Sequence, residues 1–129
     1  MKINKNSTIP AVKMEMDGAK DVTMKVLIGP KDGSQNIIMR YFRIFPGGHT
    51  PLHEHNFEHI IKVEKGNGLA IDENGKEHKI TEGQSIFVES NKRHQFRNNS
   101  SEPFEFTCAI LNQEAISYPL SPSPCPQKP

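Results

Sequence analysis

The chain has 129 residues, a formal net charge of +1 at neutral pH and two cysteines. This length is enough for one domain with a single core. The near-zero charge does not favour nucleic acid or an acidic membrane, and no apolar run approaches the roughly 20 residues that would span a bilayer. The first residues lack the apolar segment of a secretory signal, and two cysteines are too few for a disulfide scaffold. We therefore expect a cytoplasmic protein.

In chain order, residues 1–20 are polar and mixed, which predicts a flexible arm or an edge strand. From Val22 apolar and polar residues alternate, which is typical of a half-buried strand. Further short strands are predicted at 37–45, 60–65, 68–73, 76–80, 84–89, 94–98 and 103–111. Many short strands at even spacing favour an all-β sandwich or barrel over residues 21–115. Residues 116–129 carry repeated prolines, which predicts an extended, mobile tail.

Two turn signals stand out between these strands. The triplet Pro46-Gly47-Gly48 is predicted to end the strand that begins at residue 37. The pair Asn74-Gly75 predicts a type I′ hairpin turn.

Four of the six histidines form the strongest functional signal: His53, His55, His59 and His94. Imidazole is the commonest metal ligand near neutral pH. Residues i and i+2 of a strand face the same way, about 7 Å apart, so His53 and His55 can point into one space. A hairpin can bring His59 and His94 to meet them. These rings predict a site for one divalent transition metal ion.

The segments around these histidines resemble the two motifs of the cupin superfamily. The first motif, G-x5-H-x-H-x(3,4)-E-x6-G, fits Gly47, His53, His55 and Gly66, with His59 at the Glu position. The second, G-x5-P-x-G-x2-H-x3-N, is matched at the end positions and departs from the pattern in the middle. There Gly83, His94 and Asn98 fit, and Glu89 and Asn91 replace the Pro and the second Gly.

The resemblance covers about residues 36–112 and implies a double-stranded β-helix, the jelly-roll barrel. More narrowly, the chain looks like small single-domain cupins with four histidine ligands. The superfamily includes dioxygenases, isomerases, lyases, epimerases, storage proteins and sensors, so the resemblance does not fix the reaction. Asn tolerates left-handed backbone angles, so Asn91 can still form the turn of the second motif.

Glu58 is an alternative to His59 as the fourth ligand. In a strand, residues 53, 55 and 59 share a face and residue 58 lies on the other, so we favour His59. Glu58 then becomes a candidate partner that orients a ligand, and it is also the nearest carboxylate for a catalytic role. The metal can be Mn, Fe, Cu, Ni, Co or Zn, because imidazole does not enforce a choice.

Other residues are predicted to line the pocket. Phe106 and Cys108 share the inward face of the last strand, and Phe96 lies two residues past His94. Cys108 has a catalytic or redox reading and a packing reading, since free cysteine behaves as a small hydrophobe. Arg40 shares parity with Phe42 and either fixes an anionic substrate or lies on the surface.

The strand containing Arg40 is apolar on both faces, which suggests that one face meets a second copy of the chain. We expect a homodimer with a small-molecule substrate. The leading functional hypothesis is a dioxygenase-like oxidoreductase acting on a small anionic or enolizable compound. The alternatives are a metal-dependent binding or sensor protein without turnover, and a metal-dependent isomerase or lyase.

Overall fold

The structure, a computed structural model, describes residues 1–113, so the Pro-rich tail and Cys125 lie outside the described residues. Within them lie nine strands, no α-helix, and two short 3-10 helices, η1 (Asn6–Thr8) and η2 (Pro30–Asp32). The strands are β1 (Val12–Lys13), β2 (Lys20–Ile28), β3 (Ile37–His49), β4 (His59–Lys65), β5 (Asn67–Ile71), β6 (Glu77–Thr81), β7 (Ser85–Val88), β8 (Gln95–Arg97) and β9 (Phe104–Leu111). No helix in this part of the chain is long and apolar enough to cross a membrane.

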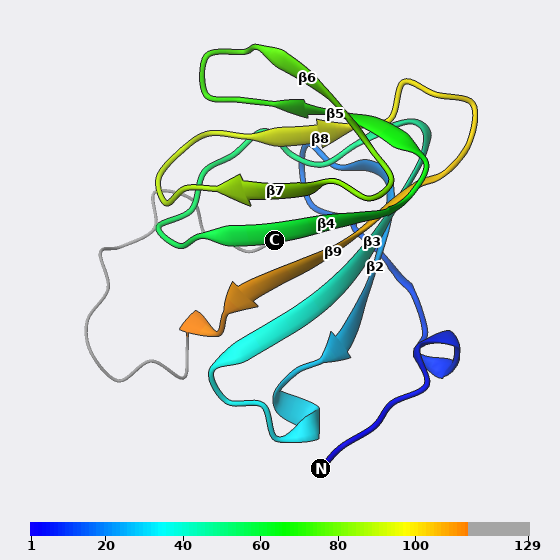
Figure 1. The fold of residues 1–129 in the computed structure, drawn as a ribbon, viewed down its shortest axis with the longest axis vertical. Helices are drawn as coiled ribbons and strands as arrows, with labels where there is room; N and C mark the ends of the chain where they lie inside the picture. Colours follow the sequence, from blue (N-terminus) through cyan, green and yellow to red (C-terminus); the bar gives the residue numbers. More distant parts are fainter. Residues whose placement is uncertain (114–129) are drawn as a thin grey trace.

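The strands form one curled antiparallel sheet in the order β6-β5-β8-β3-β9-β4-β7, with β2 added to β3 and β1 added to β2. In Figure 1 the strands β5, β6 and β8 lie above β4 and β7, while β2, β3 and β9 fan out below. The prediction of an all-β jelly-roll barrel is confirmed.

Strand β3 connects the two parts of the barrel. It pairs with β9 from Ile37 to Ile44 and then with β8 at His49. The prediction that Pro46-Gly47-Gly48 ends this strand is wrong, because the triplet carries it on from one partner to the next. Gly48 is required by close approach: a Cβ atom there would lie 2.5 Å from the carbonyl oxygen of Lys20.

The β5–β6 hairpin is present, but its turn is not type I′. That turn needs a positive φ at both central residues, and only Gly75 has one, at 79°. Instead, Oδ1 of Asp72 accepts hydrogen bonds from the backbone N–H groups of Asn74 and Lys76, at 2.9 and 3.0 Å. The aspartate side chain therefore organises the turn.

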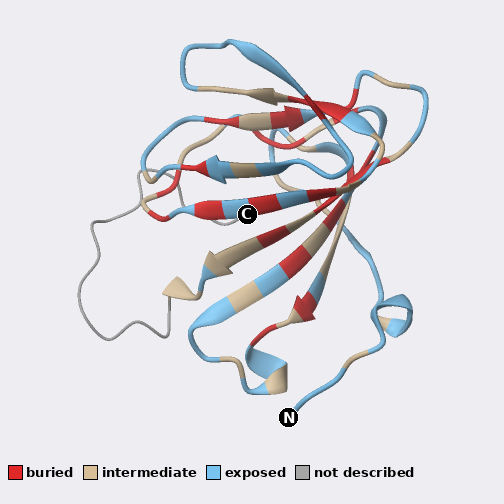
Figure 2. Cartoon of the chain, viewed as in Figure 1, coloured by how far each residue is buried: buried red, intermediate tan, exposed pale blue. Residues whose placement is uncertain are grey.

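Alternation along the strands places the apolar side chains inside the barrel, and Figure 2 shows buried segments along β3, β4 and β9. The core cluster draws on strands β2 to β9 except β5: Val22, Phe42, Ile44, Ile61, Val63, Ile80, Val88, Phe96, Phe104, Phe106 and Cys108. Phe106 is central, with ring centroids of Phe42, Phe96 and Phe104 at 5.1, 5.2 and 5.5 Å. Three of these rings, those of Phe42, Phe96 and Phe106, also line the pocket that contains the histidines.

The N-terminal arm lies along β2. Strand β1 pairs antiparallel with β2, and the side chain of Asn4 donates hydrogen bonds to Leu27 and Asp32. Met14, which follows β1, packs against the core cluster. Residues 1–20 are predicted to form a flexible arm or an edge strand, and within them an edge strand is present at residues 12–13.

Candidate metal centre

The four histidines come from three places in the chain. The connection between β3 and β4 carries His53 and His55, β4 begins at His59, and His94 immediately precedes β8. His53 and His94 form a backbone bridge in which each N–H donates to the other carbonyl, at 3.2 and 3.0 Å. Asn91 adopts a φ of 62° and donates its N–H to the carbonyl of His55. The left-handed turn expected at Asn91 is confirmed. The turn directs the chain so that His94 lies beside the other histidines.

The four imidazole rings converge. Centroids of His53 and His55 lie 4.2 Å apart, and those of His59 and His94 lie 4.9 Å apart. Between these pairs, the His55–His59 distance is 5.2 Å and the distances from His94 to His53 and His55 are 5.7 and 5.8 Å. His55, His59 and His94 are buried, and His53 is half-buried.

In the rings of His94 and His59, the contacts of Nδ1 leave Nε2 available to bind a cation. Nδ1 of His94 lies 2.9 Å from the carbonyl oxygen of Lys92. A carbonyl only accepts, so Nδ1 carries the proton and Nε2 keeps its lone pair. Nδ1 of His59 faces Cys108 Sγ at 3.5 Å, while its Nε2 is buried without a hydrogen-bond partner. A buried polar atom without a partner is costly, so a cation at this point would relieve it.

The spacing of the nitrogens suits one metal ion. Two nitrogens about 2.0–2.1 Å from one ion, at tetrahedral or octahedral angles, lie about 2.9–3.4 Å apart. Nε2 of His53 and Nε2 of His55 lie 3.2 Å apart. His53, His55 and His94 each offer a nitrogen within 4.8 Å of the others. These three histidines therefore fit a metal ion. His59 is not part of this group of three, although its ring centroid lies 4.9 Å from that of His94 and its Nε2 has no hydrogen-bond partner.

Burial favours the neutral form of three of these imidazoles, those of His53, His59 and His94, and the neutral form is the one that binds metal. Burial is the main cause that lowers the pKa of His53 to about 4, with smaller contributions from His94 and Arg40. Burial likewise lowers the pKa of His59 to about 2, and it lowers the pKa of His94. An uncharged ring has a free lone pair, so metal binding near neutral pH displaces no proton from these three.

Arg40 contributes a buried positive charge beside the histidines. The residue is 5% exposed, and its guanidinium lies 5.0 Å from the ring centroid of Phe42. Nη2 donates to Cys108 Sγ at 3.3 Å, whereas Nε has no partner. Among residues 1–113 no carboxylate forms an ion pair with it. A buried cation without a counter-charge is unfavourable. An anion bound beside Arg40 would therefore stabilise the site.

A pocket of about 40 Å³ lies among these groups. Arg40, Phe106, Cys108 and Phe96, all predicted pocket residues, line it together with the four histidines. Burial raises the pKa of the Cys108 thiol, and Arg40 opposes that shift. Thus Cys108 both packs in the core and joins Arg40 to His59.

Glu58 lies elsewhere. It is exposed, between the buried side chains of Phe57 and His59, so the structure does not bring it to the metal ligands. The reason is strand parity, since β4 turns residues 59, 61 and 63 inward.

Two contributors to the site are absent from the sequence-based prediction. Phe57 stacks on His55 and on His59, with centroids at 4.8 and 5.1 Å, and its parity with both histidines was a usable signal. Met14 lines the pocket from the N-terminal arm. No local pattern marks Met14, because its place depends on β1 pairing with β2.

The comparisons with known proteins agree with this fold. A sequence model for the family described as "Cupin domain" matches residues 40–110. The polyketide cyclase RemF from Streptomyces resistomycificus is similar, with a TM-score of 0.85 and 25% identity over 95% of this chain and 83% of that chain. A structure described as a predicted oxalate decarboxylase from Thermotoga maritima has a TM-score of 0.76 and 25% identity, over 85% of this chain and 98% of that one.

Among curated proteins, the transcriptional activator RhaR of Pectobacterium carotovorum is 38% identical over 67 residues. The match takes in 52% of this chain and 23% of RhaR, so it spans less than a quarter of that relative's length.

Proposed function

Because the chain belongs to the cupin family, whose sequence model matches residues 40–110, we propose that it is a metalloenzyme that acts on a small organic anion. The ligands in this proposal are His53, His55, His59 and His94. The reaction type we propose is oxidative and dioxygenase-like. The observation that carries the proposal is a buried, unpaired arginine beside four converging imidazoles.

Charge is the argument for an anion. Four neutral imidazoles would leave the full charge of a divalent ion in place, and Arg40 adds a further buried positive charge nearby. A carboxylate or enolate would offset both, since charge-assisted hydrogen bonds to arginine are strong in a poorly solvated site. When bound, the ion would supply Lewis-acid and, for Fe, Mn or Cu, redox chemistry.

The protein's own residues would hold and orient the substrate. Arg40 would bind an acidic group, with its guanidinium steadied by Phe42 and Cys108. No carboxylate among the described residues lines the 40 Å³ pocket. An isomerase or lyase needs a group that moves protons, so such a reaction at this site would have to use a group other than a carboxylate.

A binding protein without turnover is the second candidate. The similarity to part of RhaR, a transcriptional activator, favours a sensor-like use of the same site. In contrast, the similar polyketide cyclase and the predicted oxalate decarboxylase carry names of enzymes. Turnover therefore separates the two candidates.

The test begins with protein purified without added metal. Elemental analysis measures bound metal per chain, and an oxygen electrode then measures uptake with a panel of carboxylic, enolizable and catecholic acids. We expect about one redox-active ion per chain and substrate-dependent oxygen uptake. Tight binding of an acid without turnover under any metal would favour the sensor. Stoichiometric zinc with no binding of any acid would contradict both.

A further inference from the structure

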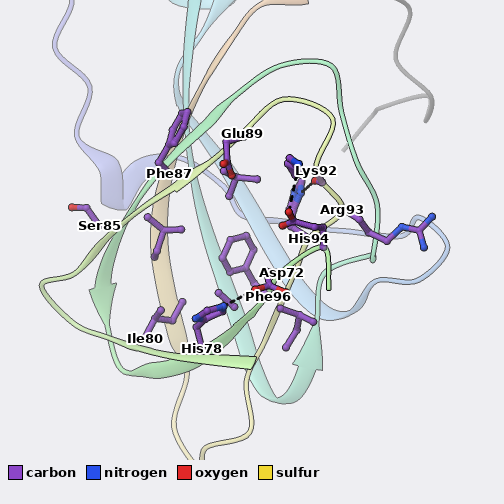
Figure 3. Close-up of a pocket in the computed structure, with 15 residues that line it drawn as sticks. Asp72, His78, Ile80, Ser85, Phe87, Glu89, Lys92, Arg93, His94 and Phe96 are labelled. Atoms are coloured by element: carbon purple, nitrogen blue, oxygen red, sulfur yellow. Dashed lines mark hydrogen bonds and ion pairs between the residues drawn. The ribbon is translucent and has the colours of Figure 1, made fainter. Parts of the chain in front are cut away.

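A second, larger cavity adjoins the histidines. It has a volume of about 370 Å³ and lies between β5, β6 and β8 on one side and β7 on the other. Figure 3 shows Phe96 and His94 at its centre, with Ile80 at one side. Its wall is apolar where the strands face inward: Ala70, Ile80, Ile86, Val88 and Phe96.

The two cavities share part of their walls. His94 and Phe96 line both the 370 Å³ cavity and the 40 Å³ pocket of the histidine cluster. The smaller pocket has room for an ion and one or two further atoms, since a water molecule alone has a share of about 30 Å³ in the liquid. The body of an organic ligand bound at the histidines therefore needs space beyond that pocket. The larger cavity provides it, at the low end of the roughly 300–1,000 Å³ range of small-molecule sites.

The far end of the larger cavity is polar and held in place. Nε2 of His78 lies 2.8 Å from Oδ2 of Asp72, and Figure 3 shows this pair at the lower edge. Oδ1 of Asp72 is held by the β5–β6 turn. Lys92 and Glu73 form a second pair, at 3.5 Å, on the side of the cavity where Figure 3 shows Lys92 beside His94. The cavity thus has an apolar middle and a polar mouth.

We propose that this cavity, which we call the ring subsite, binds the flat apolar ring of an aromatic carboxylic acid whose carboxylate lies at the histidines and Arg40. This inference deepens the proposed function and rests on it for the position of the acidic group. Branched aliphatic side chains and the face or edge of Phe96 offer the contacts that a planar ring prefers. The polar mouth would admit hydroxyl-bearing rings.

The probes are 2-naphthoate and acetate, which share a carboxylate and differ in the ring. Titration calorimetry measures both dissociation constants on zinc-loaded protein, where no redox turnover interferes. Ala70→Phe and Ile86→Phe each fill the ring subsite from opposite walls. Both residues are partly buried and pack against the core cluster, so the free energy of unfolding of each variant is measured first to show that it is folded. The matched control is Ala11→Phe, at an exposed position of the arm.

We expect wild-type protein to bind 2-naphthoate at least about tenfold more tightly than acetate, because ring burial adds apolar contact. Each cavity variant should reduce that ratio to near one while metal content and acetate affinity stay unchanged, and the control should keep the ratio. Equal affinity for the two acids in wild-type protein, or an unchanged ratio in both folded cavity variants, would overturn the subsite.

The uncharged probe 2-naphthol separates this inference from the proposed function. Binding of 2-naphthol that both cavity variants weaken supports the ring subsite, even if wild-type protein holds no metal and binds no acetate. That same absence of metal and acetate binding would end the proposed function.

Discussion

In two of the histidine rings, the contact made by one nitrogen decides which nitrogen is available to a cation. His94 donates from Nδ1 to a carbonyl, and His59 faces Cys108 through Nδ1. In both rings Nε2 is then the atom available to a cation. Phe57 packs on two of the rings and limits their rotation. The neutral, oriented imidazoles are therefore a property of the surrounding side chains as much as of the histidines.

Replacing His59 with Ala should remove the metal, because it deletes the nitrogen that has no other partner. The loss of affinity should exceed the roughly 10–100-fold that changes in supporting residues cause. The matched control is Glu58→Ala at the adjacent, exposed position. Metal per chain after dialysis is the measurement. Loss of metal from Glu58→Ala and retention in His59→Ala would reverse the ligand assignment.

Without metal, the protein should lose stability as the pH falls from about 6.5 toward 4. The folded pKa of His53 is lowered to about 4, and that of His59 is lowered further, whereas an unfolded histidine titrates near 6.5. Between these values the unfolded chain binds protons that the folded chain does not, so the free energy of unfolding rises with pH. Urea titrations of chelator-treated protein at several pH values measure this slope.

His59→Gln should flatten that slope, and His78→Gln, at an exposed position, should not. A wild-type slope of zero between pH 6.5 and 4.5 would show that the histidines are not neutral in the folded state.

Arg40→Met should weaken binding of acetate to the metal-loaded protein by at least about tenfold, because it removes the buried cation. Metal content should not change. The free energy of unfolding should stay the same or rise, since a buried charge that forms no ion pair among residues 1–113 is replaced by an apolar side chain of similar length. Calorimetry and urea titration measure the two effects. Arg97→Met, at an exposed position of β8, is the control, and equal losses of acetate affinity in both variants would count against Arg40.

At the scale of the elements, strand β3 connects the part of the site that contains Arg40 with the part that contains His94. Its first part carries Arg40 beside β9, and its last residue, His49, pairs with β8 next to His94. At Gly48, where β3 passes from β9 to β8, the backbone of β2 lies so close that a Cβ atom would not fit. Arg40 and the strand that follows His94 are therefore linked through one continuous strand.

Gly48→Ala should reduce the free energy of unfolding by about 2–3 kcal/mol, the cost of overpacking. Its Cβ would lie 2.5 Å from one carbonyl oxygen and 2.9 Å from another. Gly75→Ala is the comparison: Gly75, unlike Gly48, has a positive φ, but nothing lies within 4 Å of its added Cβ, so the change should cost only about 1–2 kcal/mol. Urea titration ranks the two, and a smaller loss for Gly48→Ala than for Gly75→Ala would contradict the close approach.

Strand parity explains how far the sequence could predict these elements. Alternation correctly turned Phe106 and Cys108 inward and separated the buried His59 from the exposed Glu58. Contacts between distant segments set the rest. The path of β3 through its Pro-Gly-Gly triplet depends on two partner strands, and the pocket contact of Met14 depends on the pairing of β1 with β2. No local pattern contains that information.

At the scale of the whole molecule, one outer face of the sheet is apolar. Adjacent residues form a row across β7, β4, β9 and β3, from Phe87 through Ile60 and Ala109 to Met39. Ile60 is 61% exposed and Phe87 is 55% exposed. Exposed apolar rows of this kind mark interaction surfaces, so the homodimer remains our prediction.

Ile60→Glu should convert the dimer to a monomer, because a two-fold interface would bring two such charges into one apolar region. Light scattering after size-exclusion chromatography measures the mass. Lys62→Glu, two residues along the same face and exposed, is the control and should stay dimeric. A wild-type mass of one chain at micromolar concentration would contradict the prediction.

The most direct test of the account is the position of the metal. Anomalous diffraction from crystals of protein purified without chelator locates the ion and the atoms around it. We expect one ion per chain, about 2.0–2.3 Å from one nitrogen each of His53, His55, His59 and His94. An ion bound elsewhere, or the rings of His59 or His94 turned away from it, would contradict the central claim.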